Sequence, residues 1–209
     1  MEPSDQIRAL FTRSDGSFLF ARWARPIVPV VFGVDDATLS TVKGAIEAVV
    51  LLAGHRMAET DPELGANFML FFVRDWIELT ETPGLDRLVP ELGDLVPRLK
   101  AAEANQYRFF RFDSEGGIKA CFAFVCMDAH MSEMPAETVA LGQAAQAILL
   151  WSDQAFTDAP PLARAGNGTL VLRPDIGDVI RTAYDPILPA MATDPSHALR
   201  IAARLGPPQ

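Results

Sequence analysis

Histidine and cysteine are scarce in this chain of 209 residues, which contains three histidines and two cysteines. The histidines, His55, His130 and His197, are far apart in the sequence, so a histidine-rich metal site is not expected. No serine occurs in a Gly-x-Ser-x-Gly turn, and the chain has neither a phosphate-binding loop nor a dinucleotide fingerprint. The sequence therefore predicts no cofactor and none of these common catalytic sites.

The two cysteines, Cys121 and Cys126, lie in one apolar run over residues 118–126. On a straight strand, an offset of five residues places the two sulfurs on opposite faces and roughly 17 Å apart. A disulfide requires Cα atoms within about 7 Å of each other. We expect two buried free thiols, and a bend near Val125 is the alternative that would permit a bridge.

An excess of basic residues is also missing, because 18 Lys and Arg stand against 27 Asp and Glu, for a net charge of −9. Such a charge opposes binding to nucleic acid or to anionic lipid. The longest apolar runs, such as residues 45–53 and 68–73, are far shorter than the ~20 residues that cross a bilayer. The first residues lack the features of a signal peptide, so we expect a cytoplasmic protein or one whose leader was removed.

What is present is enough apolar sequence for a real core, with 49% hydrophobic and 22% charged residues. We expect a single domain over residues 1–209 and an α+β fold in which a mixed sheet packs on long helices. Strands are expected at residues 26–34 and 67–73 and, as a hairpin, at 107–113 and 118–126. Pro26 and Pro29 lack ladder donors, which places the first strand at a sheet edge.

Helices are expected to alternate with these strands. One follows Asp35 or Asp36 as its cap, and another covers residues 85–99 but is interrupted by Pro90 and Pro97. Residues 128–133 form a short extended connector, and a surface loop of about 15 residues with a turn at Asn167-Gly168 follows Asp153. Short helices are predicted at residues 5–11, 175–184 and 194–205.

The central stretch, residues 135–153, is an amphipathic helix on its periodicity alone. A sharper interpretation compares it with the helix of a zinc peptidase, which needs two His four residues apart, a Glu after the first, and in the longer form a third His. If Gln146 stands at the second His, then Gly142 stands at the first, Gln143 at the Glu and Ser152 at the third. Glycine has no ligand atom and glutamine can serve neither as a strong ligand nor as a base. With Asp153, these positions would line a vestigial cleft that holds no metal and no catalytic residue.

The chain resembles, along most of its length, the proteobacterial family of domain of unknown function 2927, whose members are often lipoproteins or secreted proteins. The resemblance rests on short motifs, namely Arg22-Trp23, Pro26-Ile27, Ala66-Asn67, Gln146 with Leu150 and Asp153, and Tyr184-Asp185-Pro186. It implies a zincin-like fold, in which the ligand helix lies beneath a mixed sheet, and a cell-envelope setting. In that family carboxylates and amides stand in the histidine positions, and Gly142 and Gln143 depart further.

Three hypotheses follow. The first is a catalytically inactive zincin-like domain that binds a protein or peptide. The second is an enzyme with another site, in which Asp128 and His130 point the same way and act with Glu133 as a metal site or an acid-base pair. The third is a structural subunit of a larger assembly.

Overall fold

A four-stranded mixed sheet forms the centre of the molecule in a computed structural model that describes residues 2–166 and 168–205. The sheet has the order β2 (Pro29–Phe32), β3 (Phe68–Val73), β5 (Ile118–Cys126) and β4 (Gln106–Phe112). The first three strands run parallel, and β4 pairs antiparallel with β5 at the edge. The predicted α+β class with a mixed sheet is confirmed. β2 lies at the opposite edge, as its prolines predicted, but it is shorter than expected.

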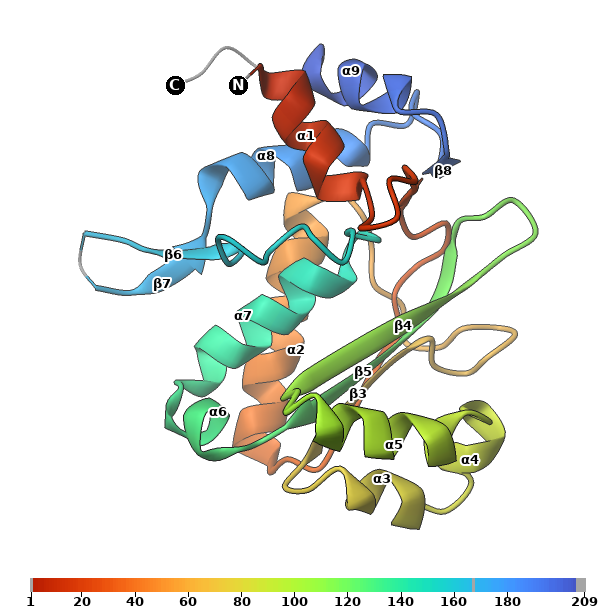
Figure 1. The fold of residues 1–209 in the computed structure, drawn as a ribbon, viewed down its shortest axis with the longest axis vertical. Coiled ribbons are helices and arrows are strands. Elements are labelled where there is room, and N and C mark those ends of the chain that lie inside the picture. Colours follow the sequence, from red (N-terminus) through yellow and green to blue (C-terminus); the bar gives the residue numbers. More distant parts are fainter. Residues whose placement is uncertain (1, 167, 206–209) are drawn as a thin grey trace.

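Helices cover both faces of the sheet (Figure 1). One face packs against α2 (Asp36–Leu52) and α7 (Ala136–Ala147), and the other packs against α3 (Ile77–Glu81), α4 (Leu85–Leu88) and α5 (Leu92–Ala101). The two central strands, β3 and β5, are hydrophobic on both faces because each face has its own helical layer to pack against. Among the described residues, no helix is both long and apolar enough to cross a membrane.

β3 shows how the two cores share one sheet. Phe68, Leu70 and Phe72 belong to the cluster with α2 and α7, whereas Phe71 and Val73 belong to the cluster with α3, α4 and α5. Such an alternation follows from the two-residue repeat of a strand. Full burial of each large apolar side chain contributes roughly 1.5–3 kcal/mol.

β5 has the same two-sided burial and carries both cysteines. Cys121 lies in the first cluster and Cys126 in the second, so their thiols point to opposite faces. Both are free, which confirms the prediction of two unbridged thiols and excludes the bend that a disulfide would need.

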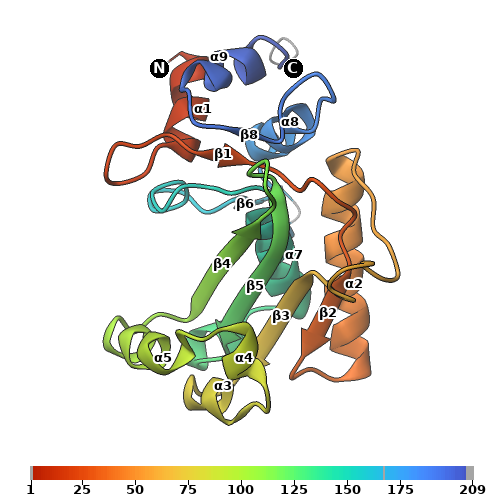
Figure 2. The same cartoon turned by 90° about the vertical axis from the view of Figure 1, so that its right-hand side faces the viewer.

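A third group of elements caps one end of the sheet (Figure 2). It contains α1 (Pro3–Phe11), α8 (Pro174–Ala183) and α9 (Ser196–Ala202), and β1 (Phe20–Ala21) pairs with β8 (Met191–Ala192). The helices were predicted, but the small sheet was not, because two-residue strands leave no readable pattern in the sequence.

Three local predictions need correction. Residues 128–133 are not extended, because α6 (Ala129–Glu133) forms there. The segment after Asp153 is not simply a loop, since β6 (Leu162–Arg164) and β7 (Leu170–Leu172) form a hairpin within it. A turn was predicted at Asn167-Gly168. Gly168 has a positive φ of 87°, and Asn167 lies outside the described residues. α7 ends at Ala147, six residues before Asp153.

The helix predicted over residues 85–99 is interrupted at Pro90, as expected, but not at Pro97. α4 and α5 are separate helices on either side of Pro90, but Pro97 lies inside α5. A proline in a helix interior costs about 3 kcal/mol, because a backbone hydrogen bond is lost. Burial of Leu95, Val96 and Leu99 on this helix offsets that cost.

Candidate functional site

A cleft of about 690 Å³ lies beside the outer edge of β4. Its walls are β4 at residues 106–110, the segment at residues 150–153 after α7, and the turn at residues 13–15. In the described part of the chain, β4 pairs only with β5, so the strand edge next to the cleft has no partner. An unpaired edge presents N–H and C=O groups that can hydrogen-bond an added strand.

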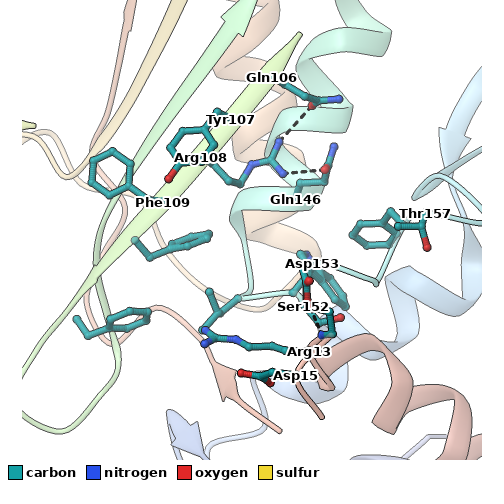
Figure 3. A pocket seen from close by; sticks show the side chains of 16 residues that line it. Arg13, Asp15, Gln106, Tyr107, Arg108, Phe109, Gln146, Ser152, Asp153 and Thr157 are labelled. Atoms are coloured by element: carbon teal, nitrogen blue, oxygen red, sulfur yellow. Dashed lines mark hydrogen bonds between the residues drawn. The ribbon is translucent and has the colours of Figure 1, made fainter. Parts of the chain in front are cut away.

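Arg108 reaches from β4 toward α7 at one end of the cleft (Figure 3). Its Nη1 donates to Oε1 of Gln146 at 2.7 Å, and its Nη2 donates to Oε1 of Gln143 at 2.9 Å and of Gln106 at 3.3 Å. Gln143 Nε2 also donates to Gln106 Oε1, at 2.8 Å. We call these four residues the Arg108 cluster. The amide oxygens face the guanidinium because arginine only donates hydrogen bonds.

The Arg108 cluster holds a charge without a counter-charge. Burial lowers the pKa of the Arg108 guanidinium, and no carboxylate of the described residues pairs with it. Arginine nevertheless keeps its proton at neutral pH. The inner end of the cleft is therefore cationic.

The opposite end of the cleft is formed by the turn at residues 13–15 together with Asp153 (Figure 3). It holds the carboxylates of Asp15 and Asp153 and the guanidinium of Arg13, so its net charge is negative. Asp153 Oδ1 accepts from Ser14 N at 3.0 Å, and hydrogen bonding to Ser14, by its side chain first and its backbone second, lowers the pKa of Asp153. Asp15 Oδ1 accepts from Ser17, which lowers the Asp15 pKa as well. Both groups are exposed carboxylates at neutral pH, so the cleft carries opposite charges at its two ends.

The residues singled out on the central helix are only partly brought together. Gln143 and Gln146 both contact Arg108, and Gln146 lines the cleft. Ser152 and Asp153 also line it, but from the segment beyond α7. Gly142 does not line it, and a Cβ atom added there would meet only Leu162, at 3.9 Å. The hypothetical first ligand position thus faces the β6 hairpin.

Sequence reasoning missed Arg108, the residue around which these glutamines are arranged. The available signal was the alternation in residues 106–110, where Gln106 and Arg108 share one face of a strand and aromatic residues occupy the other. Two polar residues at alternate positions of an otherwise aromatic strand indicate a face that is exposed to solvent or has a function. Its contact with a helix some 35 residues later could not be read from the strand.

The alternative site at Asp128, His130 and Glu133 assumed an extended segment on which Asp128 and His130 point the same way, and the structure has a helix there. Asp128 caps α6 through a hydrogen bond from Met131 N to its Oδ1, at 2.7 Å, and the other two residues lie within this short exposed helix. Residues two apart on a helix do not face each other. In the part of the chain that the structure describes, no group of three or more His, Cys, Asp or Glu is placed to hold a metal ion.

Several motif residues behind the family resemblance hold α7 in place. Trp23 Nε1 donates to Ala147 O at 2.9 Å, and Tyr184 Oη donates to Ile148 O at 2.8 Å. These bonds satisfy carbonyls at the C-terminus of the helix, where the backbone has no further intrahelical partner. Burial raises the pKa of Tyr184, which keeps its hydroxyl proton for this bond.

Three comparisons with known proteins found no relative of this chain. No protein-family model, no curated protein sequence and no solved structure matches the chain.

Proposed function

We propose that this chain is a zincin-like domain that binds an extended peptide segment of a partner protein in the cleft beside β4, without hydrolysing it. We base the zincin-like assignment and the cell-envelope setting on the resemblance to the family of domain of unknown function 2927. The element order supports the former, because α7 packs against a mixed sheet whose antiparallel edge strand borders the cleft.

The observation that carries the proposal is the pair of hydrogen bonds between Arg108 and the side chains of Gln143 and Gln146. The comparison with a zinc-peptidase helix assigns them the positions of the general base and a metal ligand, and both accept hydrogen bonds from the Arg108 guanidinium. A guanidinium at hydrogen-bonding distance repels a divalent cation, and amides supply no base that could activate water. The open edge of β4 supports the binding part, since an extended peptide can add to it as a further strand.

Elemental analysis tests the first half of the proposal. Protein purified without chelator and then incubated with zinc should retain, after desalting, far less than one zinc per chain. One equivalent that is lost on substitution of Gln146 by alanine would contradict the proposal.

Selection from a random peptide display library tests the second half. Selected peptides should slow hydrogen exchange of backbone amides in residues 106–112, while exchange in the opposite edge strand, β2, stays unchanged and serves as the internal control. If selected peptides protect neither β4 nor the segment at residues 150–153, the cleft is not the binding site. A stable native complex that leaves the cleft unprotected would instead favour the structural-subunit hypothesis.

A further inference from the structure

The Arg108 guanidinium has N–H groups that make no hydrogen bond to the described residues. The guanidinium has five N–H groups, and it makes three hydrogen bonds to the amides of Gln106, Gln143 and Gln146. Its Nε is buried and has no hydrogen-bond partner among the residues that the structure describes. A buried donor without a partner is rare in proteins and destabilises the state that contains it.

No carboxylate of the described residues compensates the charge of Arg108, unlike the charges of three other arginines. Arg25 contacts Asp61 and Glu63, Arg204 contacts Asp185, and Arg173 contacts Asp175. Amide oxygens offer Arg108 partial charges only. A partly desolvated guanidinium gains most from a carboxylate, because a charge-assisted hydrogen bond is about twice as strong as a neutral one.

If a ligand carboxylate pairs with Arg108, the neighbouring residues of β4 determine which ligand side chain should lie beside that carboxylate. Phe110 is two residues further along β4, on the same face, and lines the same cleft. Leu150, Trp151 and Phe156 add apolar surface to the cleft wall. A strand added to the edge of β4 would place alternate side chains next to Arg108 and next to Phe110.

We propose that the cleft selects extended peptides in which an acidic side chain faces Arg108 and a large apolar side chain, two residues away, faces Phe110. This inference rests on the proposed function. At the other end of the cleft, the carboxylates of Asp15 and Asp153 outnumber the single cation, Arg13, and disfavour a second acidic side chain there, so one acidic position should be selected. An internal side chain is the occupant, because β4 and the cleft continue past Arg108 to Phe112.

The test uses peptide selections against the wild type, Arg108→Gln and Arg111→Gln. Arg111 is the matched control, because it lies on the same strand but donates to Leu88 O on the other face of the sheet. We expect Asp or Glu to be enriched about tenfold at one position of the peptides selected by the wild type, with a large apolar residue two positions away. The enrichment should persist with Arg111→Gln and disappear with Arg108→Gln.

A second measurement does not depend on any variant folding. A selected peptide, acetylated and amidated at its ends, should bind the wild type at least about tenfold more weakly when its acidic residue is replaced by the matching amide. Equal binding of the two peptides would overturn this inference and leave peptide binding itself intact. Binding that requires a free C-terminal carboxylate would also overturn it. Failure to obtain cleft-binding peptides would contradict the proposed function instead.

Discussion

Two guanidinium groups in this molecule have contrasting surroundings. Arg25 contacts the carboxylates of Asp61, at 3.4 Å, and Glu63, at 3.1 Å, and Asp61 is only 5% exposed. Asn67 completes this Arg25 cluster by donating to Asp61 Oδ2. Arg108, by contrast, contacts only amide oxygens and leaves its Nε without a partner among the described residues.

The difference is the basis for proposing a binding role for Arg108 and a structural role for Arg25. In the Arg25 cluster, opposite charges and hydrogen bonds are matched within the chain, so it stabilises the loops that enter β2 and β3. The Arg108 cluster lacks an anion and opens onto a cleft. An unmatched charge beside an open strand edge supports the proposal that an acidic peptide segment binds there.

The largest expected loss of stability follows from a substitution in the Arg25 cluster, at Asn67. Asn67 is fully buried, accepts from Val28 N at 2.8 Å, and donates to Pro26 O and to Asp61. Asn67→Ala should lower the free energy of unfolding by about 3 kcal/mol, because it leaves buried polar groups without partners. Urea denaturation measures this, with Gln6→Ala on the exposed surface as a control that changes stability by less than about 0.5 kcal/mol. A loss below about 1 kcal/mol would show that water replaces the amide.

His197 extends the comparison to a side chain that packs against Phe20 but has no hydrogen-bond partner among the described residues. Both ring nitrogens are buried without hydrogen bonds among the described residues, and burial, with Arg200 and Arg204 nearby, lowers its pKa to about 4. The imidazole is therefore neutral in the folded protein. Unfolded chains bind the proton below pH ~6.5, so stability is full above that pH and falls as the pH decreases toward about 4.

Substitution by phenylalanine isolates this contribution of His197. The difference between the unfolding free energies of His197→Phe and the wild type should grow by on the order of 2 kcal/mol between pH 7 and pH 4. Other acidic and histidine groups titrate in both proteins and cancel in the difference. Parallel stability curves would mean that His197 is already protonated in the folded state or is reached by water.

The smallest expected effect compares the two arginines directly. Arg25→Met should lower the free energy of unfolding by about 1–2 kcal/mol, because buried Asp61 loses its cation. Arg108→Met should change it by less than about 1 kcal/mol, because removal of an unpaired charge offsets the lost hydrogen bonds. Thermal or urea denaturation at low salt measures both. A larger loss at Arg108 than at Arg25 would assign Arg108 a structural role.

Much of the fold could be predicted, because it depends on local patterns. Alternating and continuous apolar runs identified β3, β4 and β5, and the Asp35 cap, which accepts from Thr38 N, identified the start of α2. Prediction failed where tertiary packing outweighed local preference, as at Pro97 inside α5, and where elements were very short, as in the β6 hairpin.

The candidate site was predicted less well, for a physical reason. The chain alone determined that Gly142, Gln143 and Gln146, rather than histidines and a glutamate, occupy the three compared positions on the central helix. Only the tertiary structure decided that Gln143 and Gln146 meet Arg108, because that contact joins a helix to a strand edge across 35 and 38 residues of chain. Hydrogen bonds of this kind depend on how α7 docks against the sheet, and docking is determined by the packing of the hydrophobic core that α7 shares with α2 rather than by any local pattern.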